Sequence, residues 1–298
     1  MDFPVSGVET YWWLPPLVAF AISCLTATGG VSGGFLLLPF QVSVLGFTGP
    51  AVSPTSLVFN VLAIPTGVYR YCREQRMVWP LAGGIIIGTL PGMFLGAIIR
   101  VTLLPDPRFF KPFVGVVLGY IGFRLIKDVF FGHNEPAPGK TAPAGFQVLS
   151  PVLNLRQVSY EFNGHRYRAN LWSILLLSFA VGIIGGAYGI GGGAIIAPFL
   201  VTVFGLPVYT VAGAALFGTF VNSIAGVLIY LLVAQLFSSS GLVIAPDWLL
   251  GALFGIGGMF GIYVGARLQR FVPSRAIKGF LAACVVFIAV VYISVIFR

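Results

Sequence analysis

Long apolar stretches alternate with short polar connections along this chain. No Asp, Glu, Lys, Arg or His occurs between Glu9 and Arg70, or between Arg168 and Asp247. Each stretch is far longer than the roughly 20 residues that one membrane-spanning helix needs. We therefore predict an all-α polytopic membrane protein, with five apolar segments in each half of the chain. These segments are 11–30, 33–46, 51–70, 78–102 and 109–131, and then 169–188, 192–205, 208–233, 248–268 and 275–297.

Both halves carry the same glycine-rich motif, GGVSGGFLLLPF in the first and YGIGGGAIIAPF in the second. The two copies align without a gap, with Gly33 on Gly192 and Pro39 on Pro198. The short apolar segment after each set of glycines would form a helix of about 21 Å, less than the ~30 Å hydrocarbon core. This pattern predicts two internal repeats, each with one half-helix or broken helix.

The basic residues bear on how the two repeats are oriented. If the short segments cross the membrane, each half has five passes and the repeats are inverted, with thirteen Lys and Arg on one side against four on the other. If they only re-enter, the repeats are parallel and the split falls to ten against seven. The positive-inside rule favours inverted repeats with both termini outside. The outer side would then hold Arg100, Arg108, Lys111 and Arg298.

The chain divides into a first membrane repeat (1–131), a polar linker (132–168) and a second membrane repeat (169–298). The linker begins with a Pro-, Gly- and Ala-rich stretch and ends in VSYEFNGHRYRA. Its Asn163-Gly164 pair lies between alternating residues, which is typical of a two-residue type I′ turn. We therefore expect a small β-hairpin on the cytoplasmic side.

The glycine motifs carry the candidate chemistry. Glycine-rich turns expose backbone N–H groups, and the amino end of a helix carries about half a positive charge, so that both attract anions. Two such ends from inverted repeats would meet near the bilayer midplane and bind an anion without a buried Lys or Arg. Small polar side chains nearby would donate hydrogen bonds to an oxyanion. The candidate substrate-binding residues are Thr28, Ser32, Gly33, Gly34, Thr55, Ser56, Asn60, Gly191, Gly192, Gly193, Thr219 and Asn222.

Purely structural roles remain open for several of these features. The motif glycines would also let helices cross closely, and Ser or Thr can bond the carbonyls of its own helix. Two Gly-x-x-x-Gly-x-x-x-Gly stripes are interpreted as helix contacts rather than as substrate sites. The stripes consist of Gly88, Gly92 and Gly96 in the first half and Gly257, Gly261 and Gly265 in the second.

Composition and motif context argue against other classes of protein. The net charge of +9 lies in short connections, so it indicates membrane topology and not nucleic-acid binding. The three cysteines lack metal-ligand spacing, and we expect neither a metal nor a cofactor. Ser32 lies in a Gly-x-Ser-Gly pattern, but both histidines of the chain lie in the linker and no base accompanies it. We therefore expect a transporter and not an enzyme.

The repeated motif, with its proline and the following Pro54-Thr55-Ser56-Leu57 run, resembles the sulfite exporter TauE/SafE family. The resemblance extends from 11 to 297. It implies a permease of the cytoplasmic (inner) membrane that moves sulfur-containing oxyanions such as sulfite or organosulfonates. The first copy departs from the Gly-x-Gly-Gly-Gly form at Ser32, and the second lacks a Thr-Ser pair.

We therefore expect a multi-pass transporter whose partners are a small sulfite-like anion and the lipid bilayer. Another small anion, a cation or a neutral solute is the alternative substrate. The sequence allows a homodimer and leaves the direction and coupling of transport open.

Overall fold

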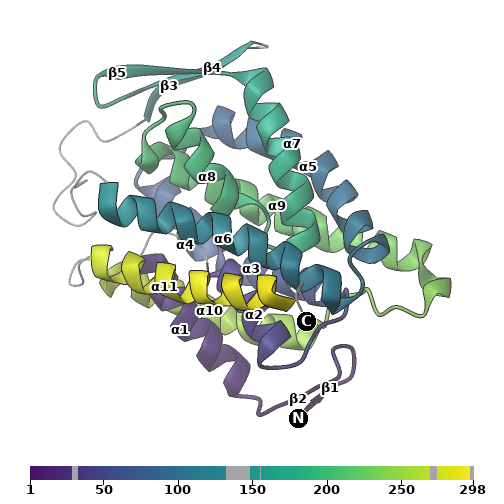
Figure 1. Ribbon diagram of the computed structural model, residues 1–298. Coiled ribbons are helices and arrows are strands. Elements are labelled where there is room, and N and C mark those ends of the chain that lie inside the picture. Colours follow the sequence, from purple (N-terminus) through teal and green to yellow (C-terminus); the bar gives the residue numbers. More distant parts are fainter. Residues whose placement is uncertain (29–32, 132–147, 155, 269–273, 296–298) are drawn as a thin grey trace.

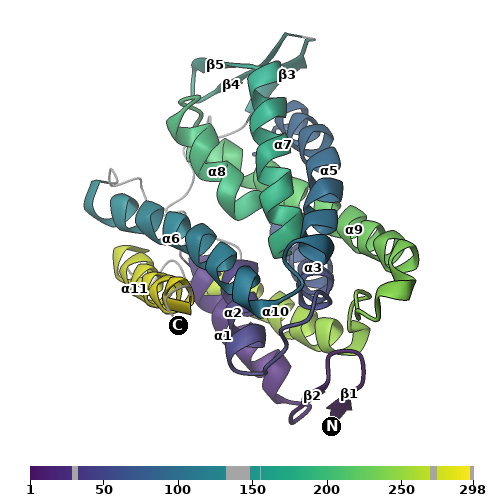
Figure 2. The same ribbon diagram turned by 45° about the vertical axis from the view of Figure 1, so that its right-hand side comes forward.

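The computed structural model describes residues 1–28, 33–131, 148–154, 156–268 and 274–295. Within these ranges the chain forms a helical bundle with one small sheet at each of two places on its surface (Figures 1 and 2). The helices of the first half are α1 (Leu14–Thr28), α2 (Gly34–Ser43), α3 (Val52–Ala63), α4 (Pro65–Arg73), α5 (Trp79–Thr102) and α6 (Pro107–Phe131). Those of the second half are α7 (Leu171–Tyr188), α8 (Gly193–Thr202), α9 (Val208–Leu236), α10 (Trp248–Leu268) and α11 (Ser274–Ser294), with a short 3-10 helix at Ser238–Ser240.

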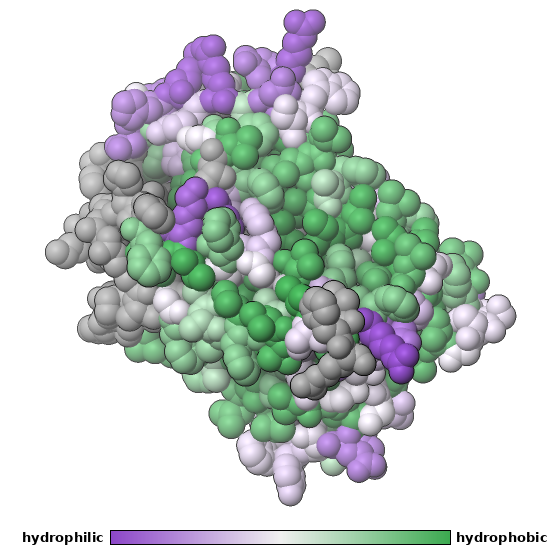
Figure 3. Space-filling view, in the orientation of Figure 1, coloured by the Kyte–Doolittle hydropathy of each residue, from purple (hydrophilic) through white to green (hydrophobic). Residues whose placement is uncertain are grey.

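The bundle has the length and the surface of a polytopic membrane protein. Among the described residues, six helical spans are long and apolar enough to cross a membrane, and three shorter apolar helices accompany them. Large apolar side chains point outward, such as Leu176, which is 72% exposed, and Phe287, which is 70% exposed. Hydrophobic residues cover the middle of the surface in Figure 3, and hydrophilic ones gather over the strands at the top. Such a surface is stable in lipid, and the predicted fold class is confirmed.

The glycine stripe of α5 packs against α7. Gly88, Gly92 and Gly96 lie against the backbone of α7 in ascending order, from Leu175 to Ile183. Ascending order on both helices means that α5 and α7 run parallel, and the two lie side by side in both views (Figures 1 and 2). A Cβ at these positions would meet backbone atoms of α7, so the glycines permit close contact.

The second glycine stripe, on α10 of the second half, makes the equivalent contact with α1 of the first half. Gly257, Gly261 and Gly265 of α10 lie against α1 from Pro16 to Cys24, again in ascending order. The first apolar segment of each half (α1 or α7) therefore packs parallel to the fourth apolar segment of the other half (α10 or α5). The interpretation of both stripes as helix contacts is confirmed.

The central helices of the two halves run in opposite directions. Gly67 of α4 lies against Leu216 of α9, whereas Leu57 of α3 lies against Gly226 of α9. The order along α3 and α4 is thus reversed along α9. The two contacts are equivalent under exchange of the halves, because the repeat alignment matches 57 with 216 and 67 with 226.

Further contacts extend this pattern of directions to the outer helices. Gly251 and Gly255 of α10 follow α3 in ascending order, so α1, α3 and α10 share one direction. Gly218 and Gly226 of α9 likewise contact α5 in ascending order, so α5, α7 and α9 share the opposite direction. Because α1 and α3 are parallel, the chain between them, which includes α2, must return to the end where α1 began. The same holds for α8 between α7 and α9.

A three-stranded antiparallel sheet of β3 (Val148–Leu153), β4 (Gln157–Phe162) and β5 (His165–Asn170) covers one end of the bundle. The hairpin between β4 and β5 turns at Asn163 and Gly164, with φ of 52° and 74°, as expected for the predicted two-residue turn. Tyr160 of β4 is buried, and its hydroxyl lies 2.7 Å from Oγ1 of Thr210 at the start of α9. The sheet is thereby held against the second half.

The chain's amino-terminal residues form a two-stranded sheet of β1 (Asp2–Phe3) and β2 (Val8–Glu9) at the other end of the bundle. Ser6, in the turn between these strands, donates from its backbone N–H and its hydroxyl to the Asp247 carboxylate, at 3.2 and 2.8 Å. Asp247 also accepts from the N–H of Leu250 in the first turn of α10. This carboxylate therefore joins the amino terminus to the start of α10.

Candidate functional site

Two short helices, α2 and α8, begin inside the protein without side-chain caps. The residue before α2 is Gly33 and the residue before α8 is Gly192, and neither offers a capping side chain. The first turn of any helix leaves backbone N–H groups without intrahelical partners, and a buried, uncapped turn keeps that partial positive charge unscreened. Gly33 and Gly34 are buried, as is Gly192. Both helices therefore present donors to the protein interior.

Asn60 of α3 faces the amino end of α2. A Cβ built on Gly34 would lie 3.0 Å from Oδ1 of Asn60 and 3.6 Å from Nδ2, so the amide lies directly against this first residue of the helix. Asn60 is fully buried, and among the described residues neither its Oδ1 nor its Nδ2 has a hydrogen-bond partner. A buried polar group in this state costs about 1–3 kcal/mol, so a function is needed to explain it.

Thr219 of α9 takes the equivalent place at the amino end of α8. It is the repeat partner of Asn60, and its hydroxyl contacts the position that a Cβ on Gly193 would occupy. The hydroxyl donates to the Ala215 carbonyl of its own helix at 2.8 Å, which leaves its lone pairs available as acceptors. The same geometry thus recurs in both halves: a helix that begins with glycine and a buried polar side chain against it.

The loop before α8 depends on glycine for its conformation. Gly189, Gly191 and Gly192 have φ of 88°, 69° and 83°, which side chains rarely adopt. Gly191 lies against Thr219 and against Ser223, whose Oγ is buried and unpartnered among the described residues. This loop is therefore folded tightly onto α9.

The reversed order of α3 and α9 sets the two half-sites at one level of the bundle. Leu57 of α3 lies against Gly226, and Gly67 of α4 lies against Leu216. Interpolation between these two contacts places Asn60 level with Ser223. Both side chains are buried and unpartnered within the described ranges. The buried polar positions of the two halves therefore lie at about the same level along α3 and α9.

Other predicted residues have partners of their own. Thr55 donates to Ala51 O at 2.8 Å and accepts from the N–H of Asp247 at 2.9 Å, which joins α3 to the start of α10. Ser56 accepts a hydrogen bond from Nε2 of Gln41 at 2.9 Å. Both hydroxyls thus hold the scaffold around the site.

Asn222 reaches away from the glycine loop toward α5. Its Nδ2 donates to Oγ1 of Thr89 at 2.6 Å, and its Oδ1 has no partner among the described residues. Gly33 packs against Ser23 and Thr26 of α1. Gly192 packs against Val181 of α7, and Thr28 is the last residue of α1. Ser32 lies outside the described residues.

Two buried polar residues were missed from the sequence. Gln41 of α2 is fully buried with Oε1 unpartnered in the described part of the chain, and as the one amide in an apolar half-helix it gave a visible signal. Arg100 was expected in an outer connection, but its side chain is fully buried at the end of α5. Arg100 lies in the last turn of α5, at the end predicted to be outer, but its burial was not expected.

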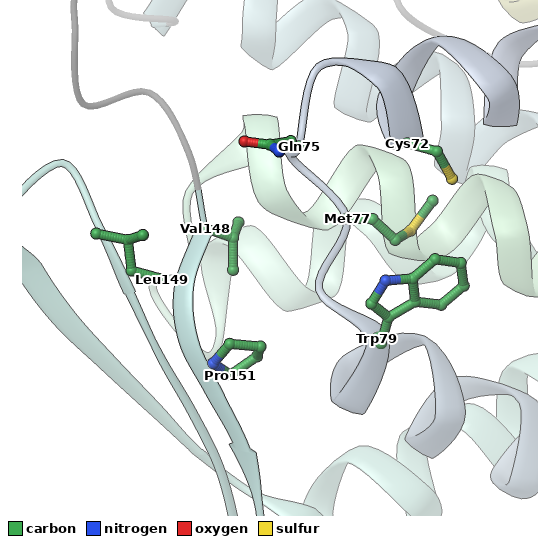
Figure 4. Close-up of a pocket in the computed structure, with 7 residues that line it drawn as sticks. All are labelled: Cys72, Gln75, Met77, Trp79, Val148, Leu149 and Pro151. Atoms are coloured by element: carbon green, nitrogen blue, oxygen red, sulfur yellow. The ribbon is translucent and has the colours of Figure 1, made fainter.

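A cavity of about 330 Å³ lies apart from these residues, between the α4–α5 turn and β3 (Figure 4). The N–H of Val148 donates to the Gln75 carbonyl at 3.1 Å and holds the strand over it. The cavity belongs to the contact between sheet and bundle, because none of the candidate residues lines it. Its walls are Cys72, Gln75, Met77, Trp79, Val148, Leu149 and Pro151.

Comparison with known proteins gives one family and several relatives. The family described as sulfite exporter TauE/SafE matches residues 16–292. The chain is 25% identical over 263 residues to the probable membrane transporter protein YjnA of Bacillus subtilis, covering 86% of this chain and 90% of that protein. It is 22% identical over 255 residues to YunE of the same organism, covering 83% and 85%. It is also 24% identical over 278 residues to the probable membrane transporter protein MamO of Paramagnetospirillum magneticum, covering 88% and 42%. No solved structure matches this chain at a significant level.

Proposed function

This chain belongs to the sulfite exporter TauE/SafE family, and we propose that it carries small sulfur-containing oxyanions, such as sulfite or organosulfonates, across the cytoplasmic membrane. It is a multi-pass membrane protein, and its relatives are named as probable membrane transporters rather than as enzymes. The nature of the substrate and the place where it binds are our proposals.

One observation carries the proposal: two uncapped helix amino ends, each against a buried polar side chain. An oxyanion would accept from the backbone N–H groups of Gly34 and Gly193, at helix ends that have no side-chain cap, and from Nδ2 of Asn60. Its binding would satisfy groups that otherwise remain unpartnered in the interior. Because helix ends carry only partial charges, they can replace part of the anion's hydration and still release it.

We also propose that the two halves are inverted repeats. The opposite directions of α3 and α9, which occupy equivalent places in the repeat, support this arrangement. So does the pairing of α6 with α11, because Gly115 lies near Tyr292 whereas Gly122 lies near Val285. In a parallel repeat, equivalent helices would share one direction.

Alternating access follows from this arrangement. The half-sites meet where α3 crosses α9, so rocking of one half against the other would open the site first to one side and then to the other. By the positive-inside rule, the end that carries the β3–β5 sheet is cytoplasmic and the end with the amino terminus is outside.

The test is flux through purified protein in liposomes loaded with sulfite, sulfate, thiosulfate or methanesulfonate, with and without a pH gradient. We expect selective movement of sulfite or the sulfonate, above that of protein-free liposomes. Acceleration by the gradient would identify proton-linked transport, and its absence a facilitator. Folded protein that moves none of these anions but moves sodium or a neutral solute would refute the proposal.

A further inference from the structure

Arg100 is a buried cation that no described carboxylate neutralises. Its side chain is fully buried, and in the described ranges the ion pairs involve Arg70 and Arg76 with Glu74 but not Arg100. The guanidinium lies over the Phe110 ring, 3.7 Å from its centroid. Burial of a charge without a counter-ion is costly in any protein, so its retention needs an explanation.

Neutral oxygens surround the guanidinium. It donates to the carbonyls of Leu104, of Thr48 at 3.3 Å and of Gly49 at 3.0 Å, and its Nε donates to Oγ of Ser53 at 3.3 Å. Carbonyl and hydroxyl dipoles satisfy the N–H groups but leave the full charge in place. Arg100 therefore projects a positive potential into its surroundings.

The charge lies beside the second glycine loop and about two helical turns from Asn60. Oγ of Ser53, which accepts from Arg100, donates to the Ala187 carbonyl in the last turn of α7 at 2.9 Å. Gly189, which opens the second glycine loop, packs on the backbone of Ser53. Asn60 lies seven residues further along α3, on the same face and about 10 Å away by helix rise.

We propose that Arg100 is a positioning residue that strengthens the binding of anions at the two helix amino ends through its charge, without touching them; this rests on the proposed function. At about 12 Å and an effective dielectric constant of about 20, one positive charge changes the affinity for a monovalent anion about tenfold. For a divalent anion the same field acts twice, which gives about a hundredfold. Arg100 thus contributes more to the binding of a divalent anion than to that of a monovalent one.

The simpler alternative is that Arg100 only ties the α2–α3 loop to α5. Three variants separate the two roles. Arg100→Gln keeps hydrogen-bond donors and removes the charge, and Arg100→Lys keeps the charge with fewer donors. Ser53→Ala removes one hydrogen bond of Arg100 and leaves its charge untouched.

The measurement is the dissociation constant of each purified variant for methanesulfonate and sulfate, with size exclusion and thermal unfolding to show that it is folded. We expect Arg100→Gln to bind methanesulfonate about tenfold more weakly and sulfate about a hundredfold more weakly. Arg100→Lys and Ser53→Ala should stay within about threefold of the wild type.

Two results would overturn the inference while the proposed function stands. The first is a folded Arg100→Gln variant that binds both anions with wild-type affinity. The second is a variant whose affinity falls by the same factor for both anions, because loss of a structural tether alone would produce that result. If the wild type itself binds neither of these anions nor sulfite, the proposed function fails and this inference with it.

Discussion

Replacement of Asn60 by leucine should stabilise the protein and abolish its affinity for oxyanions. Leucine has the same branched shape as asparagine but no polar atoms. Both amide atoms of Asn60 are buried and without partners among the described residues, so the substitution breaks no hydrogen bond that the structure describes. It removes only an unpaired polar group and the donor that the proposed substrate needs.

The expected magnitude follows from these contacts. Removal of an unsatisfied buried amide contributes about 1–3 kcal/mol to the free energy of unfolding. Gly34 lies close to the amide, because a Cβ built on it would be 3.0 Å from Oδ1 of Asn60. The leucine methyl groups therefore have little room, and we expect the gain in stability at the lower end of that range. A ligand at a hundred times its dissociation constant would stabilise the wild type by about 2.7 kcal/mol, and Asn60→Leu by almost nothing.

The assay is thermal unfolding of the detergent-solubilised protein with and without sulfite. Asn222→Leu is the matched control, because Nδ2 of Asn222 donates to Thr89 at 2.6 Å. The control also removes an unpartnered oxygen but loses a hydrogen bond of about 1 kcal/mol, so it should gain less stability than Asn60→Leu. The reasoning is refuted if Asn60→Leu is less stable than the wild type without ligand, or if sulfite stabilises it as much as it stabilises the wild type.

Three further predictions follow from the same contacts. Gly34→Ala should lower sulfite flux at least tenfold by displacing the amide beside it, whereas Gly83→Ala, on an open helix face, should leave the flux unchanged. Gly92→Ala should destabilise the protein by about 1–3 kcal/mol, measured by thermal unfolding, because its Cβ would meet the backbone of α7. Burial raises the pKa of Tyr160 from 10.0 to about 12, so the folded protein retains a proton that the unfolded chain releases. Stability should therefore fall as the pH rises from about 10 to about 12, with a smaller fall in Tyr160→Phe; equal pH profiles would contradict this.

Elements with strong local signals were predicted well. The half-helices expected at 33–46 and 192–205 are observed at Gly34–Ser43 and Gly193–Thr202. Each begins at its glycine and ends before Gly46 or Gly205, which have φ of 70° and 65°. The Asn163-Gly164 turn was equally visible, because two-residue hairpins require particular residues.

Two differences came from proline. The single segment expected at 51–70 is divided into α3 and α4 at Pro65, whose ring cannot continue a regular helix without a break. Strand β3 was not predicted, because Pro151 lies within it. β3 lies at the edge of the sheet, where a strand tolerates proline since one side makes no ladder bonds.

The candidate site was only partly accessible from the sequence. The contact of Gly34 with Asn60 and of Gly193 with Thr219 joins residues that the repeat alignment had matched. The partner of Thr55, in contrast, is the N–H of Asp247, which lies 192 positions away. No local pattern encodes such a contact, and burial of Arg100 likewise depends on a loop about 50 positions away.

The most direct test is the structure of the protein with selenite, a heavier analogue of sulfite whose selenium can be located by anomalous scattering. We predict one selenite where α3 crosses α9, within hydrogen-bond distance of the amide N–H groups at Gly34 and Gly193 and of Nδ2 of Asn60. Selenite bound instead at exposed lysines or arginines, with Asn60 free of it at saturating concentration, would contradict the account.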